Sequence, residues 1–419
     1  MSYAIVRHLR RTILSSQSIR LETTVTSLTQ EEFVFKPPVT QWNKLIREAE
    51  KIVGYPTSFM NLRWLLSDEF ANLAIHLRKI VGSNHPIVKT ARTLLYNEHN
   101  NLQPWGLVIL LLSKAISTPN DTLQTPTLIE KQRMLAELTE MIRTGHYIHR
   151  GLLNMPLEEQ DSTKETSMFA NKIAILIGDY LLVTANGMLA RLRNQDLSHL
   201  ISTALRDLSE GEFYGTRDEQ NMPLPGKPVQ NKNDFLKISC ETVPLDVTDV
   251  SGSPKREWVL RTMYNGGTLF GRGCEGALLL AGKSEEEQKK AYLFGCHLCL
   301  AWQAASELQK FAEDSKEPFS VVSAPVLFAL SENNELFKQF ENTKSITSID
   351  LENLKNEVFK TKALEKTREL HRENVEKAIS YIDMFGDNQS TQTIKKLIDS
   401  GGITLSFIYM IISIYILYI

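Results

Sequence analysis

Apolar residues recur three and four positions apart along most of the chain, which is the spacing of one face of an α-helix. No run of alternating apolar and polar residues competes with this pattern. We therefore predict an all-α fold. The expected helices cover residues 42–53, 61–81, 129–153, 169–193, 197–210, 257–281, 285–313 and 353–384, with two more between residues 86 and 117.

Two polar segments interrupt the helices. Residues 118–126 contain two prolines and small polar residues, which predicts a loop. Residues 215–256 are longer, polar and contain five prolines. A structureless stretch of that length within a compact domain is usually functional or disordered. Because helices of the same kind resume after it, we expect a mobile insertion within one domain of residues 40–390.

The composition indicates which cellular compartment and which kinds of partner are favoured for this chain. The chain has 419 residues, 42% of them hydrophobic, so it can bury a sizeable core. Its formal net charge of -2 does not favour a general affinity for nucleic acid. The cysteines, Cys240, Cys274, Cys296 and Cys299, are too few and too unevenly placed for a secreted disulfide framework. A reducing compartment is therefore favoured.

The first 30 residues are basic. They contain Arg7, Arg10, Arg11 and Arg20 among serines and threonines, with no acidic residue before Glu22. Such a segment can form a basic amphipathic helix, which is typical of mitochondrial presequences. We expect residues 1–30 to be a presequence, although a basic leader without an address has the same composition.

The last residues, 403–419, form an uncharged and mostly apolar run. As a helix this run would extend roughly 25 Å, slightly less than the hydrocarbon core of a bilayer, which is about 30 Å thick. Its isoleucines and tyrosines are equally typical of an aggregation-prone strand. Membrane insertion, such a strand and a splice-variant end all stay open.

Two neighbouring helices contain a pattern of chemical interest. The helix predicted at residues 129–153 contains the sequence HRGLLN at residues 149–154, and the next contains NKIAILIGD at residues 171–179. This pair resembles the all-trans prenyl diphosphate synthase family, in which the two segments read His-Asp-Asp-x-x-Asp and Asn-Lys-x-Ala-x-Leu-x-Gly-Asp. His149 is retained, whereas the three aspartates of the family fall on Arg150, Gly151 and Asn154.

A second aspartate motif is altered in the same way. Residues 295–310, GCHLCLAWQAASELQK, resemble the family's Gly-x-x-Leu-Gly-x-Ala-Phe-Gln-x-x-Asp-Asp-x-x-Asp. Gln303 is retained, and the three aspartates fall on Ser306, Glu307 and Lys310. The family's Gly-Lys-x-x-Arg-Pro loop falls on residues 99–104, HNNLQP, and a Lys-Thr pair falls, in a looser alignment, on Asn265 and Gly266.

In the resembled family these aspartates hold Mg²⁺ ions that bridge the diphosphate of an allylic substrate. Mg²⁺ takes carboxylate, phosphate and water oxygens as ligands. Arg150 would repel a divalent cation, yet its guanidinium could bind a phosphate directly. The alternative is an ordinary salt-bridged arginine on a helix. His149 alone is more often a packed residue than a ligand. We therefore assign no catalytic residue and no bound metal to this chain.

Three other patterns have simpler interpretations. Residues 271–276 match Gly-x-Gly-x-x-Gly, but no strand precedes them, so close helix packing is favoured over a dinucleotide site. Cys296 and Cys299 lack a second ligand pair at zinc spacing and are expected to be buried thiols. His146 and His149 could face one metal ion from adjacent turns, but no carboxylate is suitably placed nearby in sequence.

A retained fold with two altered aspartate motifs is similar to the non-catalytic subunit of the hetero-oligomeric, decaprenyl-type synthases of mitochondria. The resemblance covers roughly residues 42–385 and implies an isoprenoid-synthase-type helical bundle around a central cavity. It also implies a regulatory or stabilising role in making the ubiquinone side chain, in a heterotetramer whose catalytic subunit binds Mg²⁺. The expected location is the mitochondrial matrix or the matrix side of the inner membrane.

Two alternatives belong to other classes. One is a membrane-tethered, lipid-binding helical scaffold without synthase partnership, motivated by the apolar end of the chain. The other is an independent synthase, whose metal site would have to come from residues such as Glu140, Asp179 and Glu307.

Overall fold

The structure is a computed structural model that describes residues 41–55, 104–116, 126–152, 161–229, 252–312, 315–341 and 343–401. All of these residues belong to one compact unit, Val39–Ile419. The predicted presequence, the predicted helix at residues 61–81 and the apolar run at residues 403–419 lie outside the described residues.

Helices account for the regular structure of the described chain, whose one β pairing is an isolated bridge between Arg217 and Pro223. The all-α prediction is confirmed. The longer helices are α2 (Gln41–Val53), α6 (Trp105–Ala115), α7 (Pro126–Arg150), α8 (Asp161–Leu192), α9 (Gln195–Gly211), α10 (Pro254–Thr262), α11 (Thr268–Leu280), α12 (Glu285–Lys310), α13 (Ala324–Glu332), α15 (Leu351–Phe359), α16 (Ala363–Asp383) and α17 (Gln389–Gly401). Shorter elements are η2 (Met263–Gly267), η3 (Asn334–Phe337), α14 (Lys338–Glu341) and η4 (Ile346–Ser348).

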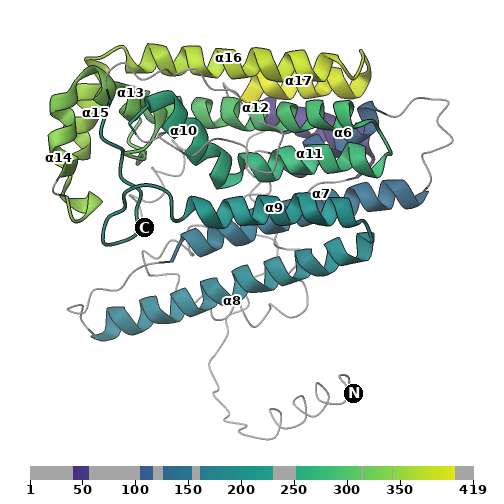
Figure 1. Ribbon diagram of the computed structural model, residues 1–419, viewed down its shortest axis with the longest axis horizontal. Helices are drawn as coiled ribbons and strands as arrows, with labels where there is room; N and C mark the ends of the chain where they lie inside the picture. Colours follow the sequence, from purple (N-terminus) through teal and green to yellow (C-terminus); the bar gives the residue numbers. More distant parts are fainter. Residues whose placement is uncertain are drawn as a thin grey trace, which may run out of the picture. The chain divides into compact units, whose positions relative to one another are not determined.

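Three pairs of long helices make the most extensive contacts. Helices α7 and α8 lie side by side, α11 packs against α12, and α12 packs on its other side against α16 (Figure 1). Helix α9 lies against α11, and α17 contacts α2 and α6. Segments far apart in the sequence therefore share one core.

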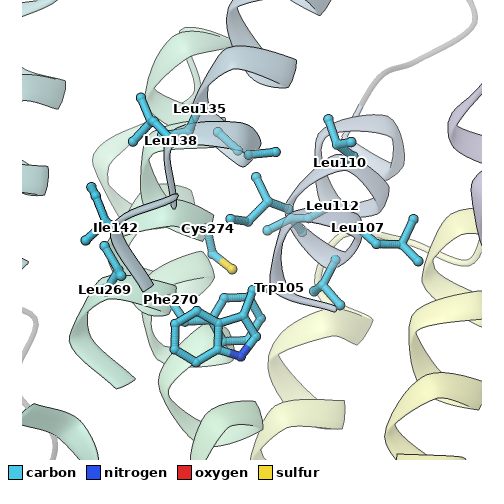
Figure 2. Close-up of a cluster of buried hydrophobic side chains, with 14 of the residues drawn as sticks. Trp105, Leu107, Leu110, Leu112, Leu135, Leu138, Ile142, Leu269, Phe270 and Cys274 are labelled. Carbon is cyan, nitrogen blue, oxygen red and sulfur yellow. The ribbon is translucent and has the colours of Figure 1, made fainter. Parts of the chain in front are cut away.

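Helix α6 lies in the centre of that core. Its residues 107–112 are all buried, as expected for a helix that is apolar all round. Trp105, at its start, stacks on Phe270 of α11 with ring centroids 5.0 Å apart, and Phe270 stacks in turn on Trp302 of α12 at 6.1 Å. Figure 2 shows Trp105 and Phe270 together, with leucines of α6 and α7 around Cys274. This aromatic stack places α6, α11 and α12 in contact.

The glycines of residues 271–276 lie inside α11 and permit close helix packing. A Cβ atom at Gly271 would lie 2.7 Å from the Cys296 sulfur of α12. At Gly273 it would lie 2.7 Å from Ile109 of α6, and at Gly276 2.5 Å from Leu197 of α9. Three neighbours thus approach α11 at glycines, which explains the pattern without a dinucleotide.

A π-helical turn, η2, joins α10 to α11. Within it Gly266 has a φ of 138°, a conformation that other residues rarely adopt. A Cβ atom here would also lie 2.6 Å from the ring of Trp105. Such π-bulges often mark functional positions, and this one places the preceding residue, Asn265, against the end of α7.

The prediction of one continuous helix over residues 353–384 is wrong. Helix α15 ends at Phe359 and α16 begins at Ala363. Between them the N–H of Ala363 donates to Thr361 Oγ1 (3.2 Å) and that of Lys362 to a carboxylate oxygen of Glu332 (2.9 Å). These side chains satisfy donors at the start of α16, so a break is stable here. The helices α13 and α17 were not predicted.

The predicted insertion at residues 215–256 is described at its two ends. Near its start the carboxylate of Asp218 accepts hydrogen bonds from the N–H groups of Met222 (2.7 Å) and Ile346 (2.8 Å). The N–H of Glu219 donates to the carbonyl of Lys344 (3.0 Å). Its start is therefore fastened to the segment after α14. Residues 230–251 lie outside the described residues, and their mobility stays a prediction.

Candidate functional site

The first altered motif lies at the C-terminal end of α7. The helix ends at Arg150, three residues before the predicted end at residue 153. The N–H groups of Gly151 and Leu152 donate to the carbonyls three residues before them, at 3.1 and 3.2 Å, which tightens the last turn. Glycine disfavours continuation of the helix. Asn154, the last position of this motif, lies outside the described residues.

His149 packs against α8. A Cβ atom at Gly178 would lie only 2.1 Å from His149 Nε2, so the glycine leaves room for the ring. The same nitrogen lies 3.3 Å from the carbonyl of Ile175 and 3.4 Å from a carboxylate oxygen of Asp179. Gly178 and Asp179, the Gly-Asp pair of the family pattern, thus lie beside His149 of the neighbouring helix α7.

Arg150 points to a different set of partners. Its Nε lies 3.0 Å from Glu212 Oε1, just beyond the end of α9. Its Nη1 donates to Oδ1 of Asn265 in η2. The side chain is about one-third exposed, at 34%. Arg150 therefore links the ends of three elements where the resembled family places a metal ligand.

The second altered motif is on α12. Glu307 is buried, and one of its oxygens accepts from the indole N–H of Trp258 and the backbone N–H of Ala324, both at 2.8 Å. The other oxygen accepts from Nε2 of Gln303 at 2.7 Å. Burial raises the pKa of Glu307, although these hydrogen bonds oppose the rise. Its carboxylate thus joins α12 to α10 and to the start of α13.

Ser306 and Lys310, the other two positions of this motif, are half-buried on α12. Lys310 is close enough to Glu307 for its charge to lower the pKa of that carboxyl. Neither residue replaces the lost carboxylates.

The two motifs meet at one cavity of about 160 Å³. Arg150 reaches it from α7, and Gln303 and Glu307 reach it from α12. The remaining lining comes from the segment after α9, from α10 with η2, and from the loop before α13: Gly211, Glu212, Tyr214, Arg217, Pro223, Trp258, Arg261, Thr262, Tyr264, Asn265, Ser320 and Val322. The structure therefore brings Arg150, Gln303 and Glu307 together, whereas the other described motif positions do not line this cavity: His149, Gly151, Ser306 and Lys310.

Arg217 is a cavity residue that the sequence did not reveal. Its two terminal nitrogens donate to the carbonyls of Asn221 (2.8 Å) and Gly211 (2.7 Å). One of them also lies 3.5 Å from Glu212 Oε2, so Glu212 stands between Arg217 and Arg150. Burial lowers the pKa of Arg217; Glu212 opposes this, and the charges of Arg261 and Arg150 add to it.

Arg261 is a second cavity residue that the sequence did not reveal. It donates from Nε and Nη2 to Glu257 Oε1, at 3.0 and 2.8 Å, and from Nη2 to the carbonyl of Leu224 at 2.9 Å. Its guanidinium also lies over the ring of Tyr214, 4.9 Å from the centroid. An alignment of relatives that covered the segment after α9 and helix α10 could have indicated these arginines.

The charges of the cavity disfavour magnesium. Three arginines line it, against two glutamates. Of these, Glu307 already accepts three hydrogen bonds and Glu212 faces two guanidinium groups. A divalent cation would meet net positive charge and few available carboxylate oxygens. The residues present do not fit Mg²⁺.

Residues proposed for other metal sites have separate partners. Glu140 accepts from the N–H of Gly106 at 2.8 Å, Asp179 lies beside His149, and Glu307 is bonded to Trp258. Across the described ranges there is no cluster of three or more His, Cys, Asp or Glu residues able to hold a metal ion. Burial lowers the pKa of His146 to about 4. Cys296 and Cys299 are buried thiols of α12, as predicted.

Comparison with known proteins defines the class of protein. A family model described as polyprenyl synthetase matches residues 159–358. The chain is 32% identical over 369 residues to the human protein named All trans-polyprenyl-diphosphate synthase PDSS2, which covers 85% of this chain and 86% of that protein. The chain belongs to the polyprenyl synthetase family.

Two further relatives extend the comparison. The Yarrowia lipolytica protein named Probable hexaprenyl pyrophosphate synthase, mitochondrial, is 24% identical over 426 residues, covering 86% of this chain and 88% of that protein. The apo form of an Arabidopsis medium/long-chain length prenyl pyrophosphate synthase superposes with a TM-score of 0.51 at 23% identity, covering 81% of this chain and 97% of that one. The fold is that of the prenyl diphosphate synthases.

Proposed function

We propose that this chain is a non-catalytic, regulatory or stabilising subunit of a hetero-oligomeric all-trans polyprenyl diphosphate synthase. The observation that carries the proposal is the state of Glu307, the one acidic residue left in the second motif. Its oxygens accept hydrogen bonds from Trp258, Gln303 and Ala324, so it serves packing and not metal binding. A partner subunit with intact aspartates would bind Mg²⁺ and perform the condensation.

Charge at the first motif supports the same conclusion. Departure of a diphosphate from an allylic carbon needs its developing negative charge to be neutralised, and the family uses metal ions for this. Arg150 contributes a positive charge, but it already faces Glu212 and Asn265. No group in the described cavity is placed to coordinate such a metal ion.

An apolar face of α8 supports partnership. Helix α8 packs on α7 with one side, where Gly145 lies against the backbone of Gly178. Its other side exposes large apolar side chains: Met168, Ile175, Leu176, Tyr180 and Val183. Their spacing places them along one face of the helix. An exposed apolar face of this kind typically marks an interaction site, and we propose that the catalytic subunit covers it.

The names of the relatives support a proposal on the product and the location. One relative's name includes polyprenyl diphosphate synthase and another's includes a mitochondrial hexaprenyl synthase. The arginine-rich first 30 residues agree with import. We propose that the complex makes the ubiquinone side chain in the mitochondrial matrix or on the matrix side of the inner membrane, as a heterotetramer.

Co-purification tests the partnership. The chain, tagged and expressed with a candidate catalytic subunit that retains both aspartate motifs, should recover that subunit in a fixed ratio. Mass photometry should show a complex with two copies of each chain. Recovery of the tagged chain alone, in conditions where the catalytic subunit is folded and soluble, would contradict the proposal.

A lipid-binding scaffold is the second candidate. Within the segment Ser167–Leu192 of α8 a window of 18 residues has a mean hydropathy of 1.7, and the helix is, by length and composition only, able to cross a membrane. Against this, its contact with α7 occupies one side of the helix. In the same purification, recovery of bound lipid without a synthase subunit would favour the scaffold.

A further inference from the structure

The exposed apolar face of α8 contains two opposite charges. Lys172 and Asp179 are seven residues apart, which is two helical turns, so they lie on the same face as Leu176 and Val183. Leu176 is 55% exposed, Val183 69% and the side chain of Asp179 60%. A cation and an anion therefore lie among the large apolar side chains of this face.

These charges are not neutralised within the described part of the chain. Lys172 is exposed and forms no ion pair with another described residue. One oxygen of Asp179, Oδ1, lies 3.4 Å from His149 Nε2 at the edge of the face, where α7 packs against α8. Burial of an unpaired charge against an apolar surface is unfavourable. A partner that covers this face must therefore supply an anion for Lys172 and a cation for Asp179.

The order of the two charges determines the direction of a partner helix that has the same charge pattern. If that helix ran parallel to α8 and in register, lysine would face lysine and aspartate would face aspartate, which is repulsive. In an antiparallel pair centred midway between the two charges, position 172 of each helix faces position 179 of the other. The same pairing places Met168, which is 56% exposed, opposite position 183. Opposite charges and apolar side chains then meet together.

The family pattern describes such a partner helix. In Asn-Lys-x-Ala-x-Leu-x-Gly-Asp, which residues 171–179 of this chain match, the lysine and the aspartate are seven positions apart. A catalytic subunit that retains this pattern has an aspartate to meet Lys172 and a lysine to meet Asp179. A second copy of this chain carries the same two charges and is the competing occupant.

We propose that α8 pairs antiparallel with the corresponding helix of the catalytic subunit through two reciprocal ion pairs. Lys172 pairs with the aspartate of the partner's Gly-Asp motif, and Asp179 pairs with the lysine of its Asn-Lys motif. This inference rests on the proposed function, because it takes the catalytic subunit as the occupant, and it adds the direction and register of the contact. The two ion pairs lie about 10 Å apart along α8 and exclude other registers.

Charge reversal with compensation tests this pairing. The tagged full-length chain is co-expressed with the catalytic subunit, and the recovered subunit is quantified. K172E brings two carboxylates together and should reduce recovery at least about tenfold, because like charges at an interface are strongly unfavourable. A lysine in place of the aspartate of the partner's Gly-Asp motif should restore recovery with K172E. The reciprocal combination, D179K with glutamate in place of the partner's Asn-Lys lysine, gives a second and independent restoration.

R368E is the matched control, because Arg368 is exposed on α16, which packs against α12 and α13. It should leave recovery unchanged, and circular dichroism confirms that each variant chain is folded. Light scattering of this chain alone identifies the competing occupant. A dimer that K172E dissociates and the double variant K172E/D179K restores would show that a second copy covers the face, and would overturn the proposal.

Two results separate this inference from the subunit role. Equal recovery of the catalytic subunit by K172E and R368E, or failure of both compensating combinations to restore recovery, would overturn the pairing and leave the subunit role intact. Failure of the wild-type chain to recover a folded catalytic subunit would overturn both.

Discussion

The carboxylate of Glu307 accepts the indole N–H of Trp258 at 2.8 Å, across the interface between α12 and α10. The same oxygen accepts the N–H of Ala324 at the start of α13. A position that serves metal binding in the resembled family is here a junction of three helices. The carboxylate therefore serves hydrogen bonds between helices in this chain.

Removal of this carboxylate should destabilise the fold. Glu307→Ala leaves two buried donors and the part-buried amide of Gln303 without an acceptor, and we expect a loss of about 3 kcal/mol in the free energy of unfolding. Denaturant titration followed by circular dichroism measures it. Glu335→Ala is the control, because that carboxylate is 73% exposed and pairs with Lys338 at the surface. Equal midpoints for the two variants would show that Glu307 has no structural role.

Stability should fall on acidification below neutral pH. Burial lowers the pKa of His297 to about 4, from an ordinary value of 6.5, and that of His146 also to about 4. Between pH 6.5 and 4 the unfolded chain binds protons that the folded chain excludes, so stability decreases as pH falls through this window. The contribution of each histidine is roughly 3 kcal/mol by pH 4.

The variant His297→Gln isolates this effect. It should be less stable than the wild type at pH 7, because the contact of the ring with Asn374 is lost, yet its stability should depend less steeply on pH. Unfolding free energies at several pH values supply the two slopes. A slope as steep as that of the wild type would contradict the assignment.

Packing of α7 on α8 predicts opposite effects for two glycines of the same helix. Gly178→Ala places a methyl group 2.1 Å from the ring of His149 and should cost about 1–3 kcal/mol. Gly187→Ala meets no atom within 4 Å and should be neutral or stabilise the helix by up to about 1 kcal/mol. Thermal unfolding of the pair decides the question, and a stable Gly178→Ala would mean that the two helices are less tightly packed.

The exposed face of α8 should bind the partner. Val183 is 69% exposed on that face, so Val183→Glu should leave the chain folded but reduce recovery of the catalytic subunit at least tenfold. Met384, which is 55% exposed just after α16, supplies the control variant Met384→Glu. Pull-down of the partner by both variants makes the comparison. Undiminished recovery with Val183→Glu would place the interface elsewhere.

Some of this structure could be predicted from the sequence. Helical spacing predicted the all-α class and the approximate bounds of α7, α8, α9 and α12, because apolar periodicity is a local property. It predicted one helix at residues 257–281, where the structure has α10, η2 and α11. The family pattern located Arg150, Gln303 and Glu307 at what is one cavity in the structure. The break between α15 and α16 was missed because it depends on Glu332, a residue 30 positions from its partner Lys362.

The partners at the site could not be predicted in this way. Arg217 reaches the cavity from a segment that looked like a polar insertion, and its contact with Glu212 depends on the conformation of that segment. Arg261 lies in the helix predicted at residues 257–281, where it pairs with Glu257 one turn away, but helical spacing does not show that this side chain reaches the cavity. Nor does spacing show whether Glu307 faces a metal ion or an indole. To distinguish these possibilities, one must know how α10, α12 and α13 are arranged in space.

Chain elongation from radiolabelled isopentenyl diphosphate, with Mg²⁺ and a short allylic primer, tests the central claim most directly. The assay is run with this chain alone, with the catalytic subunit alone and with both. We predict no labelled polyprenyl product from this chain alone and a rate with both chains that clearly exceeds the catalytic subunit by itself. Mg²⁺-dependent elongation by this chain alone, at the rate of the mixture, would contradict the account.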